Sequence, residues 1–240
     1  MSLRELAGRI TDEIAGTVGQ VDDEAAERLV EALAGANRVF LAGAGRSGCA
    51  VKAFAMRLAH LGLDAHVVGE TTTPAMAGND LLVVGSGSGS TGTLVAVAEK
   101  TAGLGGRIAL VTISETSTIG QLAEIVVRLP APTPKLEQPG ETTSIQPMGS
   151  LFEQSLLVVF DAVILALIAA YTKSVTGSGR VTSLVTAVLG ILYGYLYLVL
   201  QMDDYALLMG SAGLVAALAV VMYLTRRIDW YSIRLEQEPS

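Results

Sequence analysis

The stretch "DLLVVGSGSGSTGTLVAVAEKTAG", residues 80 to 103, places a buried strand, a glycine-rich loop and a helix in direct succession. The run "LLVV" is apolar without a break, which is typical of a strand that is covered on both faces. The residues from 91 to 103 have the spacing of a helix. A buried strand that leads into a helix is the unit from which parallel sheets are built.

The same alternation continues on both sides of this unit. Further strands are predicted over 37–43, 64–69, 107–113 and 124–130, and further helices over 3–18, 22–34, 49–62 and 150–170. Strands that alternate with helices indicate parallel βαβ units. We therefore expect a doubly wound α/β domain with a parallel sheet of about five strands.

The loop inside the opening stretch, "GSGSGSTGT" (85–93), is rich in glycine and hydroxyl groups. Ser86, Ser88 and Thr91 offer hydroxyls, while Gly87 and Gly89 let backbone N–H groups approach an anion closely. The following helix points the positive end of its dipole at the same place. Such a loop suits a compact phosphomonoester. A flexible Gly/Ser linker is the alternative, but the strand before the loop and the helix after it argue against a linker.

A second glycine loop, "GAGRSG" (43–48), also follows a strand and precedes a helix. It fits the G-x-G-x-x-G pattern of dinucleotide-binding proteins, which by itself is a weak signal. A dinucleotide site also needs an acid near the end of the second strand for the ribose. Glu70 is the candidate for that role, and it comes late, so a dinucleotide is the least favoured ligand.

Composition excludes several other classes of protein. The net charge of the 240 residues is −7, and no basic stripe is present, which argues against a nucleic-acid partner. Cys49 is the only cysteine, so a disulfide framework is excluded and a reducing compartment is expected. The N-terminal residues have amphipathic spacing and interspersed acids, unlike a signal peptide.

The last 70 residues differ from the rest of the chain. All seven tyrosines and the only tryptophan lie beyond residue 170, and every phenylalanine lies before it. Residues 181–202 and 205–225 contain no charged residue, and each run is long enough to span a hydrocarbon core of ~30 Å as a helix. We predict a linker over 171–180, a transmembrane hairpin over 181–225 and a tail over 226–240.

The charges beside these spans predict how the hairpin is oriented. Lys173 and Arg180 precede the first span, Arg226 and Arg227 follow the second, and only acids occupy the turn. The positive-inside rule then places the α/β domain and the C-terminus in the cytoplasm, with the hairpin in the inner membrane and the lipid bilayer as a partner.

The motifs of the first 168 residues resemble those of a known family. The S-x-S-G-x-T pattern at 86–91 is similar to the signature of the sugar isomerase (SIS) domain. The segments "GAGRSGCAVKAFAMRLAHLG", "VVGETTTPA", "DLLVVGSGSGST" and "SIQPMGSLFEQSLLVVFDAV" resemble 6-phospho-3-hexuloisomerase. The resemblance implies a flavodoxin-like fold, a homotetramer, no metal or nucleotide cofactor, and an aldose–ketose type isomerisation between 3-hexulose 6-phosphate and fructose 6-phosphate.

The resemblance also implies roles for individual residues. Glu153 would be the base that moves a proton between adjacent sugar carbons through an enediolate. The substrate phosphate would be bound by Ser47, Ser86, Ser88 and Thr91, with Gly87 and Gly89 beside it and Arg46 as a further contact. His60 would assist catalysis. Without the resemblance, Glu153 reads as an acid that complements a helix dipole, and His60 as a packed core residue.

Two features of the sequence depart from the family. Ser90 stands where the signature usually has Glu, and the family's charged tail with a His-Ala-Asn-like motif is replaced by "AAYTKSVTGSGR" (169–180). If that tail completes a neighbouring subunit's site, activity is weakened here. Residues 192–231 resemble the C-terminal end of the CreD inner-membrane family, so the chain reads as an engineered fusion. Two alternatives to a tethered enzyme stay open, a scaffold that displays the hairpin and a sugar-phosphate sensor.

The last expectation concerns residues 150–170, which are also apolar. Asp161 interrupts this run, and a carboxylate near the middle of a membrane span costs ~2.5–3.5 kcal/mol on insertion scales. We therefore predict that this segment is the closing helix of the α/β domain and does not span the bilayer. Asp161 is expected to face polar groups of the domain, and the seam with the membrane segment is expected near residue 170.

Overall fold

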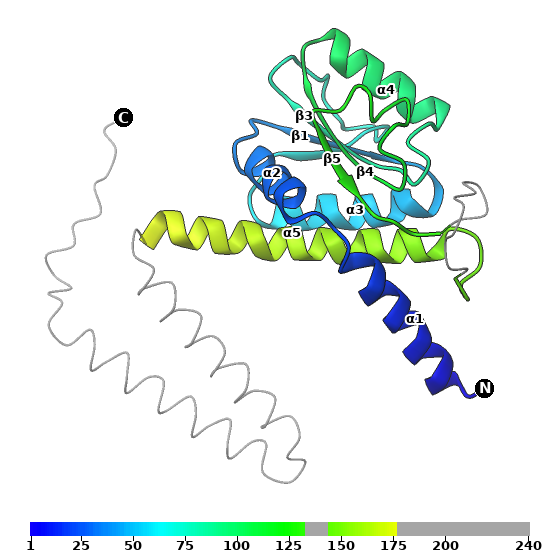
Figure 1. Ribbon diagram of the computed structural model, residues 1–240. Coiled ribbons are helices and arrows are strands. Elements are labelled where there is room, and N and C mark those ends of the chain that lie inside the picture. The colour runs from blue at the N-terminus through cyan, green and yellow to red at the C-terminus, as the bar shows by residue number, and fades with distance from the viewer. Residues whose placement is uncertain (133–143, 177–240) are drawn as a thin grey trace, which may run out of the picture. The chain divides into compact units, whose positions relative to one another are not determined.

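The computed structural model describes residues 1–132 and 144–176 (Figure 1). Met1–Ser174 form one compact unit, separate from the rest of the chain. The predicted spans 181–202 and 205–225, the tail and the last four residues of the linker (177–180) lie outside the described residues. The elements in chain order are α1 (Leu3–Val18), α2 (Asp23–Ala34), β1 (Val39–Gly43), α3 (Gly45–His60), β2 (Ala65–Val67), β3 (Leu81–Gly85), α4 (Gly92–Gly103), β4 (Arg107–Thr112), β5 (Ile125–Arg128) and α5 (Ser150–Thr176).

The five strands form one sheet in the order β2-β1-β3-β4-β5, and all neighbours are parallel. The prediction of a doubly wound, flavodoxin-like sheet of five strands is confirmed. The chain winds to one edge through β1 and β2 and then returns to β3, so the order reverses between β1 and β3. In open α/β sheets, ligands bind beyond the carboxyl ends of the strands at such a switch point.

Both faces of the sheet are covered, which explains the unbroken apolar runs of the strands. One face packs against α2, α3 and α5, and the other packs against α4 (Figure 1). Alternate residues of β3 serve the two layers: Val83 faces the first, and Leu82 and Val84 face the second. In the first layer Phe54 of α3 stacks on Phe160 of α5, with ring centroids 4.1 Å apart.

Helix α5 begins as a core helix of the domain, as predicted. Buried side chains recur along one face, including Phe152, Leu156, Phe160 and Leu167. Asp161 forms an ion pair with Arg57 of α3, with Nε and Oδ1 3.0 Å apart, so the expected polar partner is present. By length and composition α5 is the one helix among the described residues that is apolar enough to cross a membrane, a criterion that core helices also meet.

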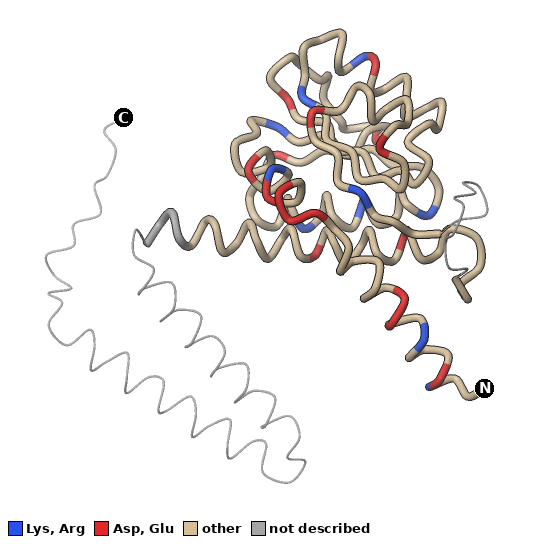
Figure 2. The backbone as a smooth tube through the Cα atoms, in the orientation of Figure 1, with Lys and Arg blue, Asp and Glu red and all other residues tan. Residues whose placement is uncertain are grey.

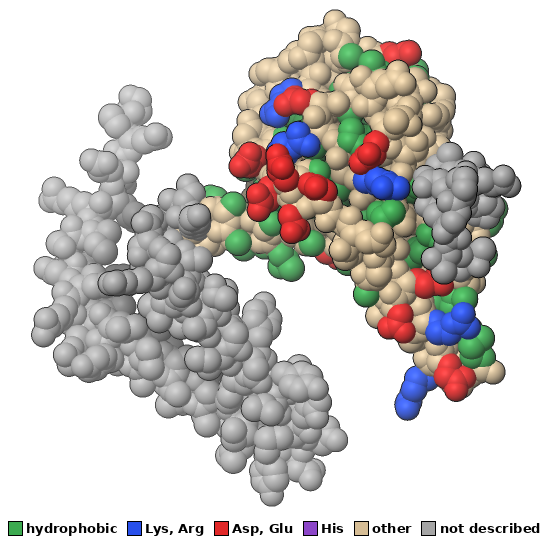
Figure 3. Space-filling model, viewed as in Figure 1, with side chains coloured by type: hydrophobic (Ala, Val, Ile, Leu, Met, Phe, Trp, Pro, Cys, Tyr) green, Lys and Arg blue, Asp and Glu red, His purple; other side chains and the backbone are tan. Residues whose placement is uncertain are grey.

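The helix does not end near residue 170, where the seam was predicted, but continues to Thr176. The reason is local, because Gly177 is the first glycine after Gly149 and no proline intervenes. Hydrophobic side chains are exposed along this distal part (Figure 3). They include Leu165 at 68% and Tyr171 at 71% exposure. The secondary structure therefore carries no boundary at residue 170.

Helices α1 and α2 are closed by side-chain caps at their N-termini. Ser2 and Glu5 form a reciprocal capping box on α1, and the Asp22 carboxylate accepts a hydrogen bond from the Ala25 N–H on α2. Acidic residues are frequent in α2, and the basic residues are scattered over the domain rather than gathered in a stripe (Figure 2).

A buried ion pair fixes the amino ends of β1 and β3. The Asp80 carboxylate, whose side chain is fully buried, accepts hydrogen bonds from Arg38 Nε (3.0 Å), Arg38 Nη2 (2.6 Å) and the Ala77 N–H (2.6 Å). Burial alone would raise the pKa of Asp80, but these hydrogen bonds and the charge of Arg38 lower it below its ordinary value. A lowered folded-state pKa stabilises the fold at neutral pH, and this contribution is lost as the pH falls through that pKa.

We expect Asp80→Asn to lower the free energy of unfolding of the domain by roughly 2 kcal/mol, because Arg38 loses its charged partner at a largely buried site. The matched control is Glu124→Gln, which breaks an equally well-formed pair with Arg107 (2.9 Å for both contacts) on exposed side chains. That change should cost less than about 1 kcal/mol. Thermal unfolding of the full chain, followed at neutral and acidic pH, makes the comparison. Equal losses for both variants, or a larger loss at low pH for Asp80→Asn, would contradict this account.

Candidate active site

The two glycine loops meet at the switch point of the sheet. Gly43 at the end of β1 and Gly85 at the end of β3 are partners in the parallel register, so the loops leave the sheet side by side. Gly85 has little room for a side chain, since an added Cβ would lie 2.6 Å from Val51 Cγ2 of α3. The glycine at this position lets α3 start close against the strand ends, where a ligand is expected in this class of fold.

The helices that follow these loops lack side-chain caps. The N-cap of α3 is Ala44, and the N-cap of α4 is Thr91, whose hydroxyl makes no capping hydrogen bond. This contrasts with α1 and α2, which Ser2 and Asp22 cap. The positive ends of two helix dipoles and their first-turn N–H groups are thus available at the same edge of the sheet. Such a pair of helix starts is suited to an anion.

The loop from Ser86 to Gly89 is held firmly, and the alternative of a flexible linker is wrong. The Ser86 N–H donates to the Val111 carbonyl (3.0 Å), and the Ile113 N–H donates to the Gly87 carbonyl (3.1 Å), which continues the ladder with β4. The Ser86 hydroxyl accepts from the Gly89 N–H at 3.2 Å. Gly89 has φ +57°, and an added Cβ would collide with Ser117 Oγ, so only glycine fits this position.

A pocket of about 550 Å³ opens between the two loops and the start of α5. Its wall contains seven of the nine predicted site residues: Arg46, Ser47, Ser86, Gly87, Ser88, Thr91 and Glu153. Gly89 shapes the loop from behind and does not line the pocket. Four hydroxyl-bearing side chains and two helix N-termini therefore share one cavity with a carboxylate and a guanidinium.

Glu153 and Arg46 form an ion pair on the wall of this pocket. Glu153 Oε2 lies 2.7 Å from Arg46 Nε, and the Glu153 side chain is 19% exposed. Glu153 sits in the first turn of α5, where its N–H donates to the Gly149 carbonyl at 3.2 Å. The carboxylate thus lies beside the N-terminus of α5, as the dipole interpretation expects, but it also faces the cavity and a cation on α3.

Sequence reasoning missed the segment that precedes Glu153. Met148, Gly149 and Phe152 line the pocket, and Met148 has φ 60°, a left-handed conformation that non-glycine residues rarely adopt. Backbone strain of this kind gathers at functional sites. The segment "SIQPMGSLFEQ" carried the family resemblance, but nothing in its composition indicated which of its residues would face a cavity.

His60 is not in this pocket. It ends α3, whereas the pocket lies at the start of that helix, and 15 residues of helix separate the two ends by roughly 22 Å. The side chain is exposed, so the interpretation as a packed core residue is wrong as well. The reason is topological, because a residue late in a helix lies at the opposite edge of a parallel sheet from the ligand site. His60 can reach such a pocket only in another copy of the chain.

The residues invoked for other ligands also lie elsewhere. Glu70, the candidate for a dinucleotide ribose, is exposed and lies 3.6 Å from Lys52 Nζ instead of lining the pocket. Cys49 is exposed on α3, and its thiol lies 3.8 Å from the Gly45 carbonyl. No cluster of potential metal ligands occurs among the described residues. The geometry therefore favours a phosphorylated small molecule over a dinucleotide.

Comparison with protein families gives two matches. Residues 32–158 match the family model of the SIS domain, and residues 152–231 match that of the inner membrane protein CreD. The first match runs from the last turn of α2 into α5 and contains every residue that lines the pocket. The second begins within α5 and continues beyond the described residues, which agrees with the expected join of two protein types and suggests an association with membranes.

Comparison with individual proteins shows which members of the SIS domain family this chain resembles. The chain is 44% identical over 167 residues to 3-hexulose-6-phosphate isomerase of Bacillus subtilis, covering 70% of this chain and 90% of that protein. It is 47% identical over 154 residues to the enzyme of the same name from Mycobacterium gastri, covering 64% and 76%. A crystal structure from Methanococcus jannaschii, with an inferred function of 3-hexulose-6-phosphate isomerase, superposes with a TM-score of 0.59 at 28% identity over 70% of this chain and 92% of that one. The chain belongs to the SIS domain family and, within it, to the 3-hexulose-6-phosphate isomerases.

Proposed function

We propose that this protein interconverts 3-hexulose 6-phosphate and fructose 6-phosphate through an enediolate. The observation that carries the proposal is that Glu153 and the hydroxyl-lined phosphate cradle share one pocket. The identity of 44% to an isomerase of this name supports the choice of substrate. The two sugars differ only in whether C2 or C3 carries the carbonyl. The reaction therefore needs one anchored phosphate and one base above two adjacent carbons.

The phosphate is proposed to bind between the starts of α3 and α4. Ser47, Ser86, Ser88 and Thr91 would donate hydroxyl hydrogen bonds, and the uncapped helix termini would complement the charge. Gly87 would let the loop backbone approach the phosphate, and an added Cβ there would lie only 3.3 Å from Phe152 Cδ1 and 3.4 Å from Ile113 Cδ1. A phosphate anchored here leaves the carbon chain of the sugar to extend toward α5.

The proton is proposed to move through Glu153. Its carboxylate would take the proton from C2 of 3-hexulose 6-phosphate, and the electron pair would pass to the C3 carbonyl oxygen to form the enediolate. The same carboxylic acid would then return the proton to C3, while the proton on the C2 oxygen passes to the C3 oxygen, so that C2 becomes the carbonyl and C3 carries the hydroxyl. Arg46, 2.7 Å from the carboxylate, is placed to stabilise the developing negative charge.

A coupled assay of fructose 6-phosphate formation from 3-hexulose 6-phosphate tests the function on the full chain. The enzyme hypothesis expects turnover that saturates with substrate. A scaffold or a sensor would show none, although a sensor would still bind the sugar phosphate in calorimetry. The assay also decides whether the chain works without the charged tail of its family.

A homo-oligomer, a tetramer by the family resemblance, is proposed as the active form. His60 keeps a role only in that arrangement, since it is exposed at the end of α3 that lies away from the pocket. A second copy that packs against the pocket edge would bring His60 to the substrate of its neighbour. Each site would then combine Glu153 from one subunit with His60 from the other.

Mixing two variants tests this shared site. His60→Ala and Glu153→Gln are each expected to be nearly inactive as pure proteins. Co-expressed and assembled at random, they should recover up to about a quarter of the parent activity, because one site in four joins the intact halves of both variants. Parent-like activity of His60→Ala alone, or no recovery in the mixture, would exclude a site shared in this way.

The C-terminal residues are proposed to tether the enzyme to the inner membrane as a hairpin with both ends in the cytoplasm. The support is the two charge-free runs, the basic residues that flank them and the match to the CreD model. The proposal expects the chain to resist alkaline extraction from membranes. Protease added to intact spheroplasts should leave the α/β domain uncut. Cleavage of that domain from outside would reverse the orientation.

A further inference from the structure

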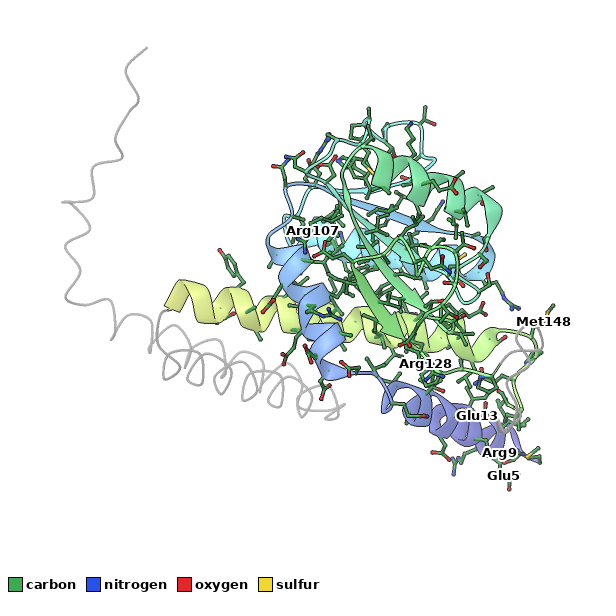
Figure 4. All side chains as sticks on the ribbon, turned by 45° about the horizontal axis from the view of Figure 1, so that its top comes forward. Glu5, Arg9, Glu13, Arg107, Arg128 and Met148 are labelled. Atoms are coloured by element: carbon green, nitrogen blue, oxygen red, sulfur yellow. The ribbon has the colours of Figure 1, made fainter. Side chains whose placement is uncertain are left out.

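Glu13 of α1 makes three hydrogen bonds to a segment far away in the sequence. Its Oε2 accepts from the Ser144 hydroxyl (2.6 Å) and from Gln146 Nε2 (3.1 Å), and its Oε1 accepts from the Ile145 N–H (2.8 Å). Three consecutive residues are thus bound by one carboxylate. Figure 4 shows Glu13 on α1 and Met148 near the start of α5.

The bound segment leads directly into the wall of the pocket. After Gln146, the Ser150 N–H donates to the Pro147 carbonyl, and the Glu153 N–H donates to the Gly149 carbonyl, both at 3.2 Å. Met148, Gly149, Phe152 and Glu153 all line the cavity. Only six residues lie between Gln146, the last anchored residue, and Glu153, the proposed base.

The contact is strong because the carboxylate is charged. Burial would raise the pKa of Glu13, but the hydrogen bonds from Ser144, Ile145 and Gln146 and the charge of Arg9 lower it below its ordinary value. The three bonds are therefore charge-assisted at neutral pH. Gln146 is itself 7% exposed, so its amide is held in a nearly closed environment. Of the residues in α1, only Thr17 is buried, which makes Glu13 one of the main links between this helix and the domain.

We propose that Glu13 is a positioning residue for the isomerisation: by fixing residues 144–146 it sets the start of α5 and holds the Glu153 carboxylate over the reacting carbons. The inference rests on the proposed function of Glu153. The phosphate cradle belongs to α3, α4 and their loops, which Glu13 does not touch. Loss of the anchor should therefore impair proton transfer and leave phosphate binding intact, since proton transfer depends on sub-ångström placement.

The first experiment compares Glu13→Gln with Asp12→Asn in the full chain. Asp12 is the adjacent acid on α1, and it is exposed with no hydrogen bond or ion pair among the described residues. Glu13→Gln should lower kcat about tenfold and change KM less than about twofold, a split expected when only the reacting group is misplaced. Asp12→Asn should match the parent. A rise in KM with kcat unchanged, or parent-like kinetics for Glu13→Gln, would overturn the proposal.

A second readout does not depend on turnover. In hydrogen exchange of the full chain, Glu13→Gln should speed exchange of the amides of residues 145–153 several-fold and leave the peptides of the two glycine loops unchanged. The double variant Ser144→Ala/Gln146→Ala removes two donors, whereas Glu13→Gln removes the charge and one of the two acceptor oxygens. It should reproduce both effects and add little when combined with Glu13→Gln, because the groups act as one unit. It also replaces Glu13→Gln if that variant does not fold.

Together, the kinetic and the hydrogen-exchange experiments distinguish failure of this inference from failure of the proposed function. If the parent shows no turnover, the proposed function fails and the exchange arm alone decides whether Glu13 orders the pocket wall. If the parent turns over but exchange of residues 145–153 is unchanged in both Glu13→Gln and the Ser144/Gln146 double variant, the positioning role is excluded.

Discussion

Glu153→Gln is expected to lower kcat by between about 10² and 10⁴ while sugar phosphate binding stays within about threefold of the parent. Glutamine keeps the shape and a hydrogen-bond acceptor for Arg46 but cannot take up a proton. Because Glu153 is only 19% exposed and faces the pocket beside Arg46, water offers a poor substitute as base. Rate measurements in both directions, with binding followed by calorimetry, make this comparison.

Glu99→Gln is the matched control for this change. Glu99 is an exposed carboxylate on α4 that forms no ion pair among the described residues. Its replacement should leave both turnover and binding unchanged. If Glu153→Gln turned over at the parent rate, another residue would have to move the proton, and the role assigned to α5 would be lost.

The double change Ser86→Ala with Ser88→Ala is expected to weaken binding of fructose 6-phosphate by about 100-fold or more. Each substitution would remove one hydrogen bond to a charged phosphate, which contributes about 1.5–3 kcal/mol. A loss of about 1.4 kcal/mol corresponds to a tenfold loss of affinity. At Ser86 the loss of binding free energy should exceed that of its one hydrogen bond to the phosphate. Its hydroxyl also accepts from the Gly89 N–H, so the loop itself loses order.

Ser90→Ala provides the control within the same loop. The Ser90 hydroxyl lies 3.5 Å from Thr118 Oγ1 and does not line the pocket. Calorimetry on the three proteins, with helix content checked by circular dichroism, should show a loss for the double variant only. Parent-like affinity in Ser86→Ala/Ser88→Ala would show that the phosphate does not bind to this loop.

The sequence was a good guide to the elements because each strand is covered on both faces. Its apolar runs located all five strands, and the predicted boundaries differ from the observed ones by at most two residues. The start of α3 was misjudged for a physical reason. The glycines from 45 to 48 resemble a loop, yet they form the first turn of the helix, which starts without a side-chain cap because it faces the ligand site.

The site was predictable in part, and for a related reason. Ser86, Ser88 and Arg46 follow strands directly, so the carboxyl edge of a parallel sheet must bring them together. Glu153 comes from a helix that returns across the sheet, and only the family resemblance pointed to it. Met148 and the anchor from Glu13 depend on tertiary contacts between segments about 130 residues apart, for which local sequence carries no signal. His60 had to be removed from the predicted site, because only the fold shows that it lies far from the pocket within the same chain.

The most direct test of the account is proton NMR of fructose 6-phosphate incubated with the full chain in D₂O. Transfer of the carbonyl between C2 and C3 predicts formation of 3-hexulose 6-phosphate and replacement of the hydrogen on C3 of fructose 6-phosphate by deuterium, with the C1 hydrogens retained. Glu153→Gln should show neither product nor label. Deuterium at C1 would indicate a different isomerisation, and an unchanged spectrum with the parent protein would contradict the assignment of this chain as an isomerase.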